Sequence, residues 1–117
     1  MGVGERPRPH GSRAVVAQGD VWLMETPNGK RRPVLVVTRD EAIEVLNNIV
    51  IAPVTSTIRR IPTAISLGVD EGIDHDSVAT FDNLAAVPRA LLTRKLGRLD
   101  PVRRREICLA LEALADC

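Results

Sequence analysis

Short apolar runs, separated by turn-forming residues, follow one another through most of the chain. Runs of about four to eight residues that alternate or are rich in β-branched side chains predict strands. The expected strands cover residues 20–25, 32–38, 48–55, 63–67, 77–81, 86–87 and 94–99. Pro27, Asn28 and Gly29 predict a turn after the first of them. Short strands with turn signals between them predict a small, mainly β barrel.

Two of these runs are apolar almost without a break. Residues 34–37 and 49–52 hold only Val, Leu, Ile and Ala, which predicts that the second and third strands are buried on both faces. Pro53 has no backbone N–H, so it is expected near an edge, a bulge or a strand end. The stretch 39–47, between these strands, has room for one helical turn.

The end of the chain changes to a helical pattern. Asp100 followed by Pro101 is typical of a helix start, with Asp as the N-cap and Pro in the first turn. Cys108 is expected to pack inside the helix interface. Apolar residues recur beside it at helical spacing, at Ile107, Leu111 and Leu114. We therefore expect one terminal helix that closes the barrel.

The first residues differ from the rest of the chain in composition and periodicity. Residues 1–17 are rich in Gly, Pro and Arg and have no periodicity on which to fold, so we expect a flexible basic arm. Residues 18–117 are then expected to form one domain. A chain of 117 residues leaves no room for a second domain of ordinary size.

Charge is balanced overall but unevenly placed. The formal net charge is +1, whereas basic residues cluster at 30–32, 59–60, 94–98 and 103–105. Such clusters favour an anionic ligand if they meet on one face. A solvated turn is expected for the acidic residues, whose spacing misses that of a calcium-binding loop: Asp70, Glu71, Asp74 and Asp76. We expect neither a metal ion nor a cofactor.

Aromatic side chains are scarce. Trp22 and Phe81 are the only large aromatic residues, and the chain has no Tyr. Proteins that bind single-stranded RNA often stack bases on several exposed rings. If Trp22 packs in the core, any RNA recognition must rest on phosphate contacts and hydrogen bonds to base edges.

The two cysteines, Cys108 and Cys117, both lie in the last segment and suggest neither a disulfide framework nor a metal site. No apolar run approaches the roughly 18 residues that a membrane span needs. The first residues also lack the apolar stretch of a secretory signal. The expectation is a cytoplasmic protein without a membrane partner.

Several segments, taken in order, carry a resemblance to a known family. They are Gly19-Asp20-Val21-Trp22, then 32–37 with Arg-Pro-Val, then 52–57 ending in Thr-Ser-Thr, then 76–78, and 92–99 before the terminal helix. Over residues 18–115 the chain resembles the MazF/PemK toxins of type II toxin–antitoxin systems. The resemblance implies an SH3-like β-barrel of the CcdB/PemK type and a homodimer. It also implies a small MazE-like antitoxin as a partner, whose acidic tail covers the active cleft.

The same resemblance implies a sequence-specific endoribonuclease that cuts single-stranded RNA without a metal and stops translation. The products would carry 2′,3′-cyclic phosphate and 5′-hydroxyl ends. The family's catalytic arginine falls on Arg32 and its catalytic threonine on Thr55. RNA-binding positions are expected at Arg31, Ser56, Thr57, Arg59 and Asn83.

The chemistry agrees with these positions. In-line attack at phosphorus builds negative charge on the non-bridging oxygens, and a guanidinium meets two of them with a planar fork of donors. Because its pKa lies above about 12, arginine is a poor general base, so Arg32 is expected to stabilise charge. The histidines are weaker candidates, since His10 falls in the arm and His75 in the acidic turn.

Two departures from the family pattern stand out. Residues 26–31 form a shorter loop than the family commonly carries over its cleft, and Gln18 replaces the arginine that opens the first motif. Two other functions therefore stay open. One is a toxin of the same fold that binds DNA gyrase and cuts nothing, and the other is an inactive barrel that binds its antitoxin.

Overall fold

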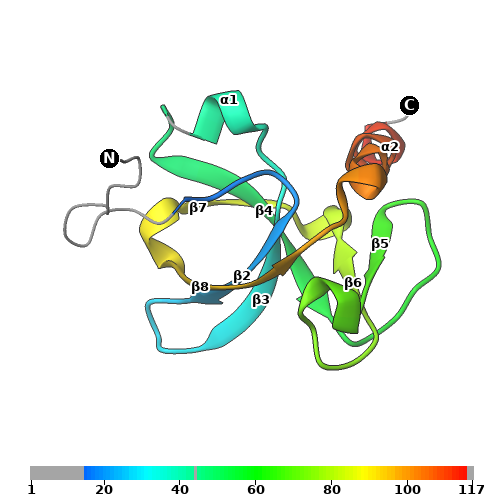
Figure 1. The fold of residues 1–117 in the computed structure, drawn as a ribbon, viewed down its shortest axis with the longest axis horizontal. Helices are drawn as coiled ribbons and strands as arrows, with labels where there is room; N and C mark the ends of the chain where they lie inside the picture. Colours follow the sequence, from blue (N-terminus) through cyan, green and yellow to red (C-terminus); the bar gives the residue numbers. More distant parts are fainter. Residues whose placement is uncertain (1–14, 44, 116–117) are drawn as a thin grey trace, which may run out of the picture.

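The computed structural model describes residues 15–43 and 45–115. In this part of the chain, seven strands form one antiparallel sheet in the order β5-β6-β4-β3-β2-β8, with β7 paired to β4 (Figure 1). The strands are β2 (Asp20–Glu25), β3 (Arg31–Val36), β4 (Asn48–Thr55), β5 (Ala64–Leu67), β6 (Ser77–Thr80), β7 (Ala85–Pro88) and β8 (Leu92–Arg98). The α-helices are α1 (Asp40–Ile43) and α2 (Arg104–Leu114). Short 3-10 helices are η1 (Val69–Glu71), η2 (Phe81–Asn83), η3 (Arg89–Leu91) and η4 (Pro101–Arg103).

The expected fold class is confirmed. The sheet curls into a half-barrel, and the C-terminal helix α2 packs beside β5 and η2 (Figure 1). The expected strands and the helical turn α1 are all present. Most of the expected arm, residues 1–14, lies outside the described residues, so the division after residue 17 stays a prediction.

Strand β3 lies between two apolar cores, as its unbroken apolar run predicted. Leu35 and Val37 pack in a larger core with Phe81 and the helix residue Ile107. Val34 and Val36 pack in a second core that contains Trp22. Each face of the strand is therefore buried against different partners, which explains why polar residues do not alternate with apolar ones.

The Gly19-Asp20-Val21-Trp22 motif is structural. Asp20 is only 3% exposed, and its Oδ2 accepts hydrogen bonds from the Ala17 N–H at 2.9 Å and the Trp22 indole N–H at 3.2 Å. Its Oδ1 lies 3.4 Å from Lys95 Nζ on the neighbouring strand β8. This buried carboxylate thus has partners on both oxygens, as burial of a charge requires.

Pro53 marks the point where β4 changes neighbours. Residues 48–51 of β4 pair with β7, whereas Val54 and Thr55 pair with β6. Pro53 lies in the gap between these two ladders. An N–H on the side of β4 that faces β6 and β7 would have no strand to bond at this position. Pro53 therefore lies near the end of β4 and at a local edge of the sheet, which are two of the positions expected for it, and the gap opens the sheet beside η2.

A close contact between backbones joins η1 to β8. Gly72 has φ +92°, and a Cβ there would lie 2.1 Å from the Leu96 carbonyl oxygen. A Cβ on Gly97 would lie 2.3 Å from the Glu71 carbonyl oxygen. Two facing glycines therefore let the turn pack directly on the strand.

Glu71 corrects the prediction of a fully solvated acidic turn. It is 7% exposed, its Oε1 accepts the Gly68 N–H at 2.6 Å, and its Oε2 accepts from Arg103 Nη1 at 3.1 Å. Arg103 also donates to both oxygens of Glu106 and to the Ser66 carbonyl on β5. The pKa of Arg103 is held above its usual value, mainly by the Glu106 carboxylate and to a smaller extent by Glu71. Asp70, Asp74 and Asp76 are exposed as expected.

The helix start is confirmed and the helix face is partly corrected. The Asp100 carboxylate accepts the Val102 N–H at 3.0 Å, although the first turn after Pro101 is a 3-10 helix and α2 begins at Arg104. Ile107 and Ala110 are the buried residues of α2, whereas Cys108 and Leu114 are exposed. The buried stripe of α2 is narrower than expected, and Cys108 lies outside it. Among the described residues, no helix is long and apolar enough to cross a membrane.

Gln18 connects three separate segments, which supports a structural role for this position. Its side-chain amide donates to the Val37 carbonyl at 2.9 Å, and its backbone N–H donates to Asp40 Oδ1 at 2.7 Å. Arg104 donates from the start of α2 to Asp40 Oδ2 and to the Gln18 carbonyl. The Gln18 N–H, followed by Arg104, holds the pKa of Asp40 below its usual value.

Candidate active site

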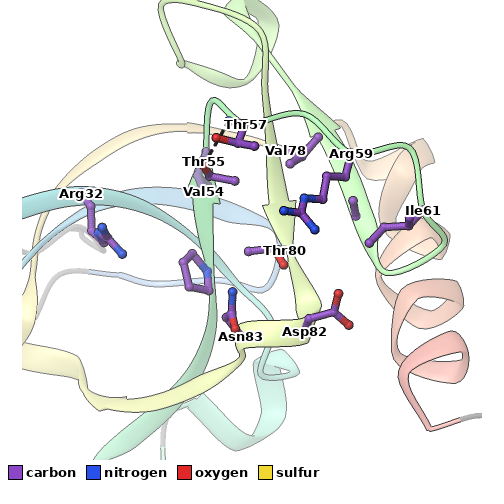
Figure 2. Close-up of a pocket in the computed structure, with 12 residues that line it drawn as sticks. Arg32, Val54, Thr55, Thr57, Arg59, Ile61, Val78, Thr80, Asp82 and Asn83 are labelled. Carbon is purple, nitrogen blue, oxygen red and sulfur yellow. Dashed lines mark hydrogen bonds between the residues drawn. The ribbon is translucent and has the colours of Figure 1, made fainter.

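A cleft opens beside η2, at the place where β4 changes partners, with a volume of about 600 Å³. Figure 2 shows the side chains that line it. They come from β3, β4, β5, β6, η2 and the loop after β4: Arg32, Pro53, Val54, Thr55, Thr57, Arg59, Ile61, Ala64, Val78, Thr80, Asp82 and Asn83. Curling of the sheet therefore brings residues far apart in sequence to one cleft.

Arg32 reaches the cleft because of its register in β3. Neighbouring side chains of a strand point to opposite faces. Arg31 lies opposite Glu25, and its Nε is 3.8 Å from Glu25 Oε1, whereas Arg32 lies opposite Met24 and lines the cleft. Within residues 15–43 and 45–115, no carboxylate forms an ion pair with Arg32. Its guanidinium is therefore available to an anion.

Thr55 is the last residue of β4, and the turn that follows orients its side chain. The Thr55 Oγ1 accepts the Thr57 backbone N–H at 3.1 Å. A hydroxyl that accepts this hydrogen bond keeps its own proton to donate. Thr55 therefore presents a hydrogen-bond donor at the cleft wall.

Arg59 and Asn83 enter the cleft from two other segments. Arg59 lies in the loop between β4 and β5, and Asn83 ends η2. In the view of Figure 2, Thr55 and Thr80 lie between the two arginines of the cleft. Arg59, like Arg32, makes no ion pair with any described residue. The cleft thus combines two unpaired guanidinium groups with hydroxyl and amide groups.

Most of the predicted site residues line this cleft. Arg32, Thr55, Thr57, Arg59 and Asn83 do so, and their individual roles stay predictions. Arg31 and Ser56 do not line it. Arg31 faces the other side of β3, and Ser56 is exposed at the tip of the turn that joins Thr55 to Thr57.

Sequence reasoning missed Asp82, Thr80 and Ile61. Asp82 lies directly before Asn83, so the same polar turn after β6 was the available signal. Ile61 and Thr80 carried no such signal, because each occurs as an ordinary loop or strand residue. Their place in the cleft follows from the pairing of β5 with β6.

The short loop after β2 takes no part in the cleft. It closes as a tight hairpin, in which the Thr26 N–H donates to the Lys30 carbonyl and the Gly29 N–H donates to the Thr26 carbonyl, each at 2.8 Å. None of residues 26–30 lines the cleft. The short loop between β2 and β3 therefore contributes no residue to the cleft.

The basic clusters do not all converge on this site. Arg103, Arg104 and Lys95 form ion pairs with Glu71, Asp40 and Asp20 respectively, away from the cleft lining. His75 is exposed beside Asp74 and is also absent from the lining. Among the described residues, no group of three or more His, Cys, Asp or Glu side chains is arranged to hold a metal.

Residues 17–115 match the family model described as the PemK-like, MazF-like toxin of type II toxin-antitoxin systems. The chain belongs to this toxin family. The toxin is 42% identical to a protein of Mycobacterium tuberculosis named probable endoribonuclease MazF5, over 89% of this chain and 96% of that protein. It is 36% identical to another from the same organism, probable endoribonuclease MazF2, over 86% of this chain and 98% of that protein.

Solved structures support the same assignment. The Mycobacterium tuberculosis toxin MazF-mt6 superimposes with a TM-score of 0.75 and 28% identity, covering 83% of this toxin and 96% of that chain. A mycobacterial endoribonuclease in complex with its cognate antitoxin shares the fold, with a TM-score of 0.72, 24% identity and coverage of 85% and 93%. The resemblance inferred from the ordered motifs is thus confirmed.

Proposed function

We propose that this toxin is an endoribonuclease that cleaves single-stranded RNA at short sequence motifs without a metal ion. The products would carry 2′,3′-cyclic phosphate and 5′-hydroxyl ends. One observation carries the proposal: the unpaired Arg32 guanidinium and the Thr55 hydroxyl line a single cleft. The relatives named endoribonucleases, at up to 42% identity, support the same activity.

The chemistry follows from the two side chains. The ribose 2′-hydroxyl gives up its proton to solvent as its oxygen attacks the adjacent phosphorus. The bond from phosphorus to the 5′-oxygen breaks, and the 5′-oxygen takes up a proton from solvent as it leaves. Negative charge grows on the non-bridging oxygens, and the two-donor face of Arg32 stabilises it. Because a fixed guanidinium supplies the positive charge, this mechanism requires no metal ion.

Thr55 supplies a further donor in this mechanism. Its hydroxyl accepts the Thr57 N–H, so its own proton can be donated to a phosphate oxygen, or the hydroxyl can orient the ribose 2′-hydroxyl. Thr57, Arg59 and Asn83 extend the polar lining beyond the reacting phosphate. Trp22 is 4% exposed and Phe81 is fully buried, so base contacts would come from polar side chains and not from stacked rings.

Two partners belong to the proposal. A homodimer is the expected working form, and a small antitoxin with an acidic tail would cover the cleft, attracted by Arg32 and Arg59. Both would operate in the cytoplasm, where the RNA substrate lies. Since RNA and antitoxin would share the two arginines, an uncleavable RNA should compete with the antitoxin in a titration.

Incubation of the purified toxin with a mixed-sequence RNA in EDTA tests the proposal. We expect cleavage at the same sites and rates with and without EDTA, and fragments whose 3′ ends resist ligation until the cyclic phosphate is removed. Activity that needs added magnesium would refute the metal-free mechanism. Inhibition of DNA gyrase supercoiling with no RNA cleavage would instead favour the gyrase-binding alternative.

A further inference from the structure

Asp82 is an acidic side chain in a cleft that is otherwise suited to anions. Among the described residues that line the cleft, it is the one carboxylate, beside the two arginines. A carboxylate repels phosphate groups, so its presence weakens electrostatic binding of RNA unless it contacts something else. Asp82 forms no ion pair within the described part of the chain, so neither arginine of the cleft is in direct contact with its carboxylate.

The Asp82 carboxylate is held by Thr63, the residue directly before β5. The Thr63 hydroxyl donates to Asp82 Oδ2 at 3.0 Å. The Thr63 carbonyl accepts the Phe81 N–H at 2.8 Å, and Phe81 is fully buried, so the backbone on both sides of this contact is fixed. Asp82 Oδ1 accepts no hydrogen bond from any described residue. One oxygen is therefore anchored and the other is free for a ligand.

The chemistry of the free oxygen narrows the ligand. An ionised carboxylate only accepts hydrogen bonds, so it matches N–H groups and not phosphate or carbonyl oxygens. Adenine, cytosine and guanine each carry an exocyclic amino group that can donate. Uracil has none, and its ring N–H lies between two carbonyl oxygens that a carboxylate repels. The bases of single-stranded RNA expose these edges for recognition.

We propose that Asp82, positioned by Thr63, is a specificity-determining residue that selects a base with an exocyclic amino group over uracil. This inference rests on the proposed RNA cleavage at the same cleft. A role in specificity differs from a role in the chemical step, because loss of Asp82 would change which sequences are bound and cut. A good contact to a base edge discriminates by about tenfold or more.

Binding to uncleavable RNA tests the inference separately from cleavage. Short 2′-O-methyl oligonucleotides would be titrated by fluorescence anisotropy: one of uracil alone, and others in which a single uracil is replaced by adenine, cytosine or guanine. We expect the wild-type toxin to bind at least one mixed oligonucleotide about tenfold more tightly than uracil alone. Replacing the selected base by its analogue without the amino group, purine for adenine or inosine for guanosine, should abolish the difference.

Matched variants connect the preference to the two side chains. Asp82→Asn keeps the shape and an acceptor for Thr63 but adds N–H donors, so the preference should fall about tenfold or turn toward uracil. Thr63→Val should weaken the preference by loosening the carboxylate, and Thr63→Ser should restore it. Thermal unfolding of each variant checks that the fold is kept.

The outcomes separate the two proposals. An Asp82→Asn toxin that binds every oligonucleotide with the wild-type ratios overturns the inference, as does a wild-type toxin without any preference. A preference that depends on Asp82, in a toxin that cuts no RNA, supports the inference and refutes the nuclease. Sequencing of the fragments from a random RNA should show the same preference at one position near the cut.

Discussion

The backbone N–H of Thr57 donates a hydrogen bond to the Thr55 hydroxyl over 3.1 Å, at the turn that ends β4. This contact fixes the hydroxyl at the cleft wall and assigns its direction, since the oxygen accepts and the proton is left to donate. It also makes the threonine roles separable, because Thr57 acts here through its backbone and Thr55 through its side chain.

The effect of replacing Thr55 on the cleavage rate should therefore depend on the hydroxyl alone. Thr55→Val keeps the β-branched shape and removes the donor, and we expect the cleavage rate to fall about a hundredfold. Thr55→Ser keeps the hydroxyl and should retain most of the activity. Single-turnover cleavage of a fluorescent oligonucleotide measures both rates. A Thr55→Val toxin with the wild-type rate would remove Thr55 from the mechanism.

Replacement of Arg32 should affect the chemical step in a different way. Arg32→Ala removes the transition-state charge partner, and we expect at least about a hundredfold loss of rate. Arg32→Lys should recover only part of it, because an ammonium lacks the planar two-donor fork. Arg105→Ala removes one exposed arginine outside the cleft and serves as the charge-matched control. Equal rates for Arg32→Ala and Arg105→Ala would contradict the assignment.

Two glycines with left-handed backbone offer a matched test of the contact between η1 and β8. Gly29 has φ +86° and open space where a Cβ would lie, so Gly29→Ala should cost about 1 kcal/mol from the backbone alone. Gly72 has φ +92° and meets the Leu96 carbonyl, so Gly72→Ala should cost about 3 kcal/mol or more. Urea unfolding of both variants measures the difference. Similar losses would mean that the backbones separate easily.

Arg103 and Arg105 lie two residues apart, and their replacement should affect the stability of the fold differently. Arg103→Ala leaves the buried Glu71 carboxylate without its cation, and we expect a loss of about 2 kcal/mol in the free energy of unfolding. Arg105 is exposed and forms no ion pair in the described part of the chain, so Arg105→Ala should change stability by less than about 0.5 kcal/mol. Chemical denaturation compares them, and equal effects would show that the contacts of Arg103 with Glu71, Glu106 and Ser66 are not stabilising.

Asp40 should make the stability depend on pH in the acid range. The Gln18 N–H, and then Arg104, lower the pKa of Asp40 in the folded protein. Its contribution is therefore complete above the unfolded-state pKa of about 3.9 and is lost as the pH falls through the lower folded-state pKa. The side chain is half exposed, so we expect only about 0.5 kcal/mol.

The corresponding variant is Asp40→Asn. Its melting temperature should lie below the wild type at neutral pH, and the two curves should converge as the pH falls below about 3.9. Measurements in the same buffer series at low and high salt would show the gap shrink with added salt, since an exposed pair is screened. A constant gap at every pH would show that the carboxylate charge is not responsible.

Local pattern determined most of the elements of this protein. The strand at 48–55 was predicted with its observed bounds, because a β-branched run between turn residues specifies an extended segment by itself. The cap at Asp100 was predictable for the same reason, since its carboxylate bonds a backbone N–H only two residues away. The ordered motifs also indicated the family, with Arg32 and Thr55 among the residues of one cleft.

Only the tertiary structure decided which side chains meet. Arg31 and Arg32 are adjacent and chemically alike, yet the pairing of β3 with β2 turns one toward Glu25 and the other into the cleft. Glu71 was expected to be solvated, but the fold places Arg103 beside it. Asp82 lines the cleft and accepts a hydrogen bond from Thr63, 19 residues earlier in the chain. These outcomes depend on strand register and on the curl of the sheet. Contacts between distant segments set both, and a local window of sequence does not contain them.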